Sequence, residues 1–240
     1  MKKIGILGGM APESTLEFYR GLTSLAQEVL PGRSYPTIII YSLNMEEFRD
    51  PLNSGNYPGA ISVLSNGIEA LSRAGADFAI IASNTPHMFF DELANKSPIT
   101  LLSIVTETAK DAKRRDFSNV GLYGTRFTME HRFYRDEFER YGISVVTPGE
   151  EARGYIHEKA MGELADGKIV ESTREKLLEI SRKMIEKEGI QALILGSTEL
   201  SFILNEEALG IPVLDTTRIG IQAAFDYSQD KPPGKAGASF

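Results

Sequence analysis

Two short segments centred on serine have the composition of small anion-binding turns. Ser83-Asn84-Thr85-Pro86 and Gly196-Ser197-Thr198-Glu199 each follow an apolar run and precede a segment of helical character. The first N–H groups of a helix have no partner inside the helix, so they can bind a carboxylate, and neighbouring hydroxyl and amide side chains add hydrogen bonds. Helix capping alone would explain either segment. The presence of two such segments favours a pair of carboxylate-binding turns.

The sequence gives little support for a hydrolytic serine. The chain contains the histidines His87, His131 and His157, and neither serine lies in a G-x-S-x-G turn. A Ser83–His87 dyad is an alternative that the spacing leaves open, because His87 follows Ser83 by one helical turn. We expect His87 instead to be a packing residue or a residue of the helix cap, or to support the site without contacting the substrate.

Cofactor and metal signals are weak. The chain has no cysteine, which excludes disulfides, thiolate metal sites and thiol catalysis for the sequence as it stands. The histidines lack H-E-x-x-H spacing, and the glycines of residues 5–9 do not complete G-x-G-x-x-G. We expect no cofactor and no metal.

The elements that must position these serines are short apolar runs that alternate with longer amphipathic runs. The expected strands are 3–7, 37–43, 78–82, 99–102, 119–123, 144–147, 192–195 and 212–214. The expected helices are 13–29, 58–73, 87–94, 107–114, 130–140, 152–164, 173–188, 201–208 and 217–228. Nearly continuous apolar strands separated by helices indicate parallel sheets covered on both faces, so the predicted fold class is α/β.

The two halves of the chain resemble each other. IGILGG at 4–9 matches VGLYGT at 120–125, and FAIIASNTPH at 78–87 matches ALILGSTELS at 192–201. Pro98 and Pro212 are separated by as many residues as Ser83 and Ser197 are. We therefore expect two similar parallel-sheet units, formed by 1–102 with 212–240 and by 103–211, with strand 212–214 in the first.

The location of the site follows from this duplication. Open parallel sheets bind ligands beyond the carboxyl ends of their strands. Both serines follow strands, as do Gly8-Gly9 and Gly124-Thr125. We therefore expect one active site between the two units, with a serine on each wall.

Composition excludes several classes of protein. The 240 residues are 42% hydrophobic with a net charge of −7 and no basic run, which argues against a nucleic-acid partner. No apolar stretch is long enough for a membrane span. The apolar N-terminal run is interrupted by glycines and Pro12, so we interpret it as a buried strand and expect a cytoplasmic protein. The Pro/Gly-rich tail 229–240 is expected to be flexible.

Several motifs together resemble the aspartate/glutamate racemases that work without pyridoxal phosphate. They are GGMAPEST at 8–15, SNTPH at 83–87, YGTRFTM at 123–129 and LGSTEL at 195–200, supported by FRD at 48–50 and HEKAMGELADGKI at 157–169. The resemblance covers essentially the whole chain. It implies cofactor-independent interconversion of L- and D-aspartate or glutamate, and a homodimer.

The chain departs from this family at the two most important positions. Family members carry cysteine at the positions of Ser83 and Ser197, where one thiolate removes the Cα proton and the opposite thiol returns a proton to the other face. A thiol with a pKa near ~8.5 can be shifted toward neutrality at a helix start. A serine hydroxyl needs a partner base. The resemblance therefore implies an aspartate racemase that is inactive as written.

Three explanations for the serines compete. The favoured one is a deliberate double cysteine-to-serine replacement that holds substrate without turnover. The second is a natural non-catalytic protein that binds acidic amino acids, and the third is a natural enzyme with different chemistry at serine. The sequence does not separate the first two. A glutamate racemase, or a related isomerase or decarboxylase, also stays open.

The resemblance also assigns substrate contacts. Arg49 and Lys168 fall at positions where aspartate-selective relatives bind the side-chain carboxylate. Both residue types suit this role, since a guanidinium can donate two hydrogen bonds to a carboxylate and an ammonium supplies a point charge. Met10 is expected beside the substrate. The expected donors to the α-carboxylate are Asn84, Thr85, Thr125 and Thr198.

Overall fold

The structure is a computed structural model that describes residues 1–230. It contains two compact units, one formed by residues up to Glu107 together with the chain from Thr217, the other by Thr108–Thr216. The last ten residues, which hold most of the tail predicted to be flexible, lie outside the described range.

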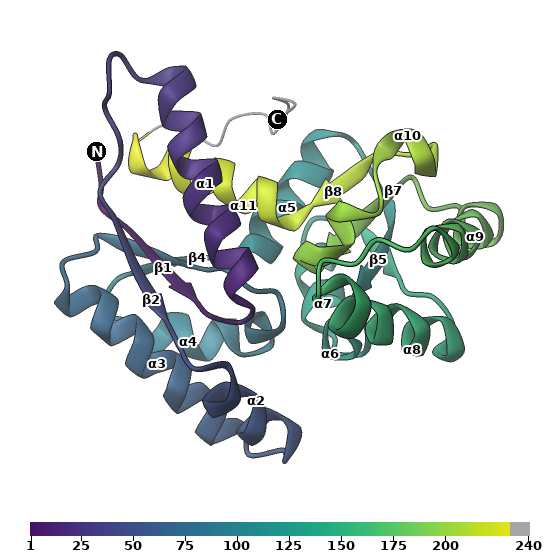
Figure 1. The fold of residues 1–240 in the computed structure, drawn as a ribbon, viewed down its shortest axis with the longest axis horizontal. Coiled ribbons are helices and arrows are strands. Elements are labelled where there is room, and N and C mark those ends of the chain that lie inside the picture. The colour runs from purple at the N-terminus through teal and green to yellow at the C-terminus, as the bar shows by residue number, and fades with distance from the viewer. Residues whose placement is uncertain (231–240) are drawn as a thin grey trace. The chain divides into compact units, whose positions relative to one another are not determined.

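Each unit contains a four-stranded parallel sheet, and the two sheets have the same strand order (Figure 1). The first has the order β2-β1-β3-β4 and the second β6-β5-β7-β8. The strands are β1 (Ile4–Gly8), β2 (Ile38–Ser42), β3 (Phe78–Ile81), β4 (Thr100–Leu102), β5 (Asn119–Gly124), β6 (Ser144–Val146), β7 (Ala192–Gly196) and β8 (Val213–Asp215). The predicted α/β class and the internal duplication are confirmed.

Burial explains why the strands read as apolar runs. Every residue of β1, β3 and β7 is buried, because these central strands have neighbours on both sides and helices on both faces. The edge strands β2 and β8 are partly exposed. In register, Ile4 of β1 lies between Ile38 and Phe78 of its neighbours.

Helices cover both faces of each sheet. In Figure 1, α1 and α11 lie on one side of the first sheet and α3 and α4 on the other. The helices of the first unit are α1 (Pro12–Val29), α2 (Met45–Asn53), α3 (Tyr57–Arg73), η1 (Thr85–Phe89), α4 (Phe90–Lys96) and α11 (Thr216–Ser228). Those of the second are α6 (Arg126–Glu130), α7 (Phe133–Glu139), α8 (Glu150–Lys159), η2 (Ala160–Leu164), α9 (Glu171–Glu188), η3 (Thr198–Phe202) and α10 (Glu206–Leu209). Helix α5 (Ile104–Arg114) carries the chain from the first unit into the second.

Local capping accounts for the helices that the prediction missed or merged. Helix α2 was not expected, although Asn44 and Glu47 form the pattern of a capping box: Asn44 Oδ1 accepts from the Glu46 N–H at 3.1 Å. The predicted helix 201–208 is wrong, because Asn205 caps a new helix by accepting from the Ala208 N–H at 2.9 Å. The predicted helix 130–140 corresponds to α7, and α6 before it was not expected.

The assignment of strand 212–214 to the first unit is wrong. This segment forms β8, whose Val213 and Asp215 pair with Leu193 and Leu195 of β7 in the second sheet. The corresponding edge of the first sheet is already occupied by β4, which pairs with β3. The chain therefore returns to the first unit at the start of α11, not at the strand before it.

The described residues also bear on membrane association. Within 1–230, no helix combines the length and the apolar character that a bilayer crossing requires.

Candidate active site

The Ser83 turn is held by a buried histidine. Ser83 follows β3 and is half-buried. His87 Nδ1 lies 2.9 Å from the Ser83 carbonyl oxygen, and His87 Nε2 accepts a hydrogen bond from the Ile104 N–H at 3.3 Å. Since Nε2 accepts, Nδ1 must carry the proton and donate to Ser83. His87 thus ties the Ser83 turn to the first residue of α5.

The environment of His87 keeps its ring neutral. The side chain is 3% exposed and stacks on Phe90, with ring centroids 5.4 Å apart. Burial lowers the pKa of His87 to about 4, because a charged imidazolium would lose its hydration. The Ser83–His87 dyad is not present, since the ring bonds the carbonyl of Ser83. The structure agrees with the expectation that His87 is a packing residue at the start of the helix.

The Ser197 turn has a different arrangement. Ser197 follows β7 and is 7% exposed, and its hydroxyl donates a hydrogen bond to Glu199 Oε2. Thr198, also buried, begins η3, where the Ser201 hydroxyl donates to the Thr198 carbonyl at 2.7 Å. A carboxylate therefore contacts the hydroxyl of the second serine directly.

Thr125 caps the helix that follows β5. Its hydroxyl oxygen accepts from the Thr128 N–H at 3.3 Å and lies 3.1 Å from the Thr128 hydroxyl. The next residue, Arg126, donates its N–H to His157 Nδ1 at 3.2 Å. Partial burial and the charge of Arg126 lower the pKa of His157. The Thr125 turn is therefore held by hydrogen bonds to Thr128 within the helix and, through Arg126, to His157 of α8.

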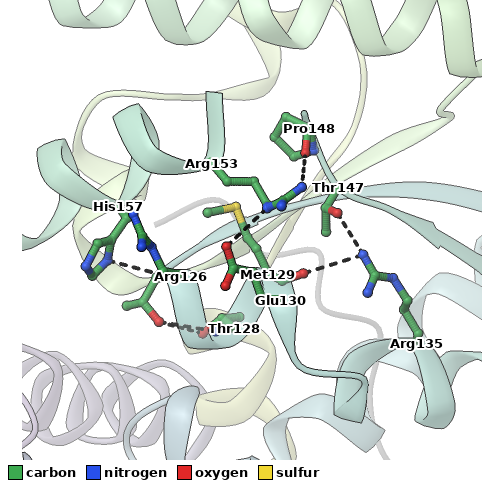
Figure 2. Close-up of polar contacts among 10 residues, drawn as sticks. Arg126, Thr128, Met129, Glu130, Arg135, Thr147, Pro148, Arg153 and His157 are labelled. Atoms are coloured by element: carbon green, nitrogen blue, oxygen red, sulfur yellow. Dashed lines mark hydrogen bonds and ion pairs between the residues drawn. The ribbon is translucent and has the colours of Figure 1, made fainter. Parts of the chain in front are cut away.

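Two arginines join the segment after β5 to the loop after β6 (Figure 2). Arg135 donates to the Thr147 hydroxyl at 2.7 Å, and Arg153 donates to the Pro148 carbonyl at 2.9 Å. Arg153 also lies 3.5 Å from Glu130. These contacts connect α6, α7 and α8 near the carboxyl ends of the strands, where Thr125 is located.

The loop after β1 is tight and holds Met10. The Gly9 N–H donates to the Thr15 hydroxyl at 2.9 Å, which closes the loop onto the first turn of α1. The Leu43 N–H donates to the Gly8 carbonyl at 3.1 Å, so the ends of β1 and β2 meet here. Met10 is 8% exposed.

The structure groups the predicted residues by unit. In the first unit, the Gly8–Met10 loop and the Ser83 turn follow the adjacent strands β1 and β3, which are in register from Ile4↔Phe78 to Leu7↔Ile81. In the second unit, Thr125 and Ser197 follow β5 and β7, whose last paired residues are Gly124 and Gly196. Asn84 is buried and Thr85 begins η1, both beside Ser83.

The two predicted cations lie on exposed segments. Arg49 belongs to α2, which follows the carboxyl end of β2, and its side chain is exposed. Lys168 follows η2; its side chain is 67% exposed and lies 3.0 Å from Asp166. The packing of each unit therefore leaves both charges at the surface.

Sequence reasoning did not predict the contact between Ser197 and Glu199. The available signal was the Ser-x-Glu spacing of Ser197 and Glu199, which allows a side-chain contact within a turn. Among residues 1–230 no cluster of three or more His, Asp or Glu side chains has metal-binding geometry.

Comparison with known proteins places this chain among the racemases. A family profile described as Asp/Glu/Hydantoin racemase matches residues 7–224. A candidate Asp/Glu racemase from Yersinia pestis is 35% identical, with 95% of this chain and 100% of that chain covered and a TM-score of 0.89. An aspartate racemase homologue from Pyrococcus horikoshii OT3 is 34% identical over the same shares of the two chains, with a TM-score of 0.84.

A curated relative matches over a shorter region. The broad specificity amino-acid racemase RacX of Bacillus subtilis (strain 168) is 29% identical over 147 residues, which are 60% of this chain and 63% of RacX. The family profile, in contrast, spans both units, and the structural relatives superpose along nearly their full length. On this evidence the chain belongs to the Asp/Glu/hydantoin racemase family.

Proposed function

We propose that this chain carries the substrate site of an aspartate racemase and that positions 83 and 197 perform the proton transfers at Cα. The observation that supports this most directly is the similar placement of Ser83 and Ser197, each within two residues of the end of a buried central strand and before a short helix. The similarity to the Pyrococcus horikoshii protein, which is described as an aspartate racemase homologue, supports aspartate as the substrate in this proposal.

The chemistry of racemisation explains what these positions must do. One group removes the Cα proton from one face of the substrate, and the other returns a proton to the opposite face, so both must reach the same carbon. A thiol titrates close enough to neutrality to take either role. A serine hydroxyl without a partner base does not, so we expect no racemisation while both positions carry serine.

The substrate contacts in this proposal divide between the two carboxylates. Arg49 and Lys168 bind the side-chain carboxylate as charged donors. Met10 provides an apolar contact beside the substrate carbon. The residues that bind the α-carboxylate are Asn84, Thr85, Thr125 and Thr198. Negative charge grows on this carboxylate as the Cα proton leaves, so preorganised donors stabilise the transition state.

The test restores both thiols. We expect the Ser83→Cys/Ser197→Cys variant to racemise L- and D-aspartate, measured by polarimetry and chiral chromatography, whereas the unmodified protein binds aspartate in calorimetry without racemising it. A control variant, Ser34→Cys/Ser144→Cys, places one thiol at an exposed serine in each unit and should stay inactive. A folded, aspartate-binding double variant without racemase activity would contradict the proposal.

The serines themselves favour a second candidate, a non-catalytic protein that binds acidic amino acids. That candidate predicts aspartate binding by the unmodified protein and no racemisation in the variant with both thiols restored. Parallel assays with glutamate decide between the two acidic substrates. The proposal also includes a homodimer, which the resemblance implies, and the cytoplasmic location expected from the sequence.

A further inference from the structure

The two serine positions differ in the groups that contact them. The Ser197 hydroxyl donates to the Glu199 carboxylate, which lies two residues further along the same turn. The residue two positions after Ser83 is Thr85, which has no carboxylate. The hydroxyl of Ser83 makes no hydrogen bond to another residue within 1–230.

The titratable group near Ser83 is the imidazole of His87, and it is already engaged in hydrogen bonds. Both ring nitrogens of His87 bond backbone groups, Nδ1 to the Ser83 carbonyl and Nε2 to the Ile104 N–H. The imidazole therefore cannot accept a proton from the Ser83 hydroxyl without breaking the contact that holds the turn.

The carboxylate of Glu199, unlike the imidazole of His87, directly contacts the hydroxyl of the neighbouring serine and can accept its proton. Within the described chain no lysine or arginine forms an ion pair with Glu199, and its carboxylate accepts a hydrogen bond from the Ser197 hydroxyl. Glu199 is half-buried, which limits competition from water for this bond.

We propose that Glu199 accepts the proton of the Ser197 hydroxyl, so that Ser197 and Glu199 act as an acid–base pair on one face of the substrate while Ser83 has no such partner. This inference rests on the proposed function. It assigns to the chain as written the proton transfer on one of the two faces of the substrate.

The proton transfer balances as follows. The Cα–H bond breaks and a new O–H bond forms on Ser197 Oγ, while the original Oγ–H bond breaks and its proton passes to Glu199 Oε2. The electron pair of the Cα–H bond stays on the substrate, delocalised into its α-carboxylate. The reverse sequence returns a proton to the same face, and no other reactant is needed.

The experiment compares the two single thiol variants. We expect Ser83→Cys alone to racemise aspartate, because a thiol on one face would work with the Ser197–Glu199 pair on the other. The matched variant Ser197→Cys retains an unassisted Ser83 and should racemise roughly 10²-fold more slowly or not at all, the usual range for a lost acid–base group.

Glu199 is tested in the Ser83→Cys background. Glu199→Gln keeps an oxygen that accepts the Ser197 hydrogen bond but cannot take its proton, so racemisation should fall by roughly 10²-fold or more. Glu199→Asp keeps the carboxylate and should restore part of the rate. A purely structural role for Glu199 would be preserved by Gln.

The outcomes separate this inference from the proposed function. Equal racemisation by the two single variants, full activity of Ser83→Cys/Glu199→Gln, or inactivity of both single variants beside an active Ser83→Cys/Ser197→Cys double variant would overturn the role of Glu199 alone. Inactivity of the double variant would overturn the proposed function, and this inference with it.

Discussion

At the scale of single residues, the two serine turns share a backbone plan but not their polar contacts. Ser197 bonds the carboxylate of Glu199, whereas Ser83 is held through its carbonyl by the neutral ring of His87. The backbone plan follows from a strand that ends where a short helix begins. The polar contacts depend on one side chain in each turn, so the two halves share a fold but differ in the groups that contact their serines.

Arg49 permits a prediction about substrate selection. Arg49→Ala should weaken aspartate binding by one to two decades, because a charge-assisted hydrogen bond typically contributes about 1.5–3 kcal/mol. Alanine, which has no side-chain carboxylate, should lose little affinity in the same calorimetric titration. The control Arg33→Ala removes another exposed arginine and should change neither affinity.

The contrasting substitution addresses the other carboxylate. Asn84→Ala should weaken aspartate and alanine alike, since both carry an α-carboxylate. Unchanged aspartate affinity in Arg49→Ala, or an equal loss for the two ligands, would leave the side-chain carboxylate to Lys168 alone.

At the scale of elements, the loops after the central strands position the site. The loop after β1 requires Gly9 to adopt φ of +88°, where the backbone passes so close to Leu43 that a Cβ atom would lie 2.3 Å from the Leu43 carbonyl oxygen. This close approach lets the ends of β1 and β2 meet beside Met10. The shape of the loop is therefore set by contact between elements as well as by local preference.

Two glycine substitutions separate these effects. Gly9→Ala combines an unfavourable left-handed conformation, costing about 1–2 kcal/mol, with the Leu43 overlap. Gly32→Ala has a similar φ of +70° but nothing within 4 Å of the added Cβ, so it tests the conformational cost alone. We expect a larger loss of unfolding free energy for Gly9→Ala in urea titrations. Similar losses in the two variants would show that the overlap is relieved cheaply.

At the scale of the whole molecule, stability depends on keeping buried polar groups neutral. His87 has an unfolded-state pKa near 6.5 and a folded-state pKa of about 4. Above the unfolded value neither state binds the proton, and the contribution to stability is complete. As the pH falls from about 6.5 toward 4, the unfolded chain binds the proton more readily, so stability decreases.

The expected loss between pH 7 and pH 4 is about 3 kcal/mol from His87, since each pKa unit corresponds to about 1.4 kcal/mol. His87→Asn keeps a donor that can reach a nearby carbonyl but cannot titrate. Comparing the unfolding free energies of the two proteins across this range cancels the contribution of the carboxylates. A parallel pH dependence for His87→Asn and the unmodified chain would contradict the assignment.

The sequence by itself determined the class of the fold and the position of the serine turns. The eight strands could be predicted because buried parallel strands require continuous apolar runs, a property that each segment carries locally. The turns at Ser83 and Ser197 could be predicted because they follow such runs and repeat in the two halves. The family assignment rested on these motifs, and the comparisons confirm it.

Only the tertiary structure decided which sheet received β8 and which groups bond the serines. Residues 212–214 form a short apolar run that could extend either sheet. The choice depends on which sheet edge is vacant, which is a non-local property. The bonds of Ser197 to Glu199 and of His87 to Ile104 depend in the same way on where the chain turns after each strand. Periodicity predicts that a segment is a strand or a helix, whereas the partner of a polar side chain is set by the three-dimensional path of the backbone around it.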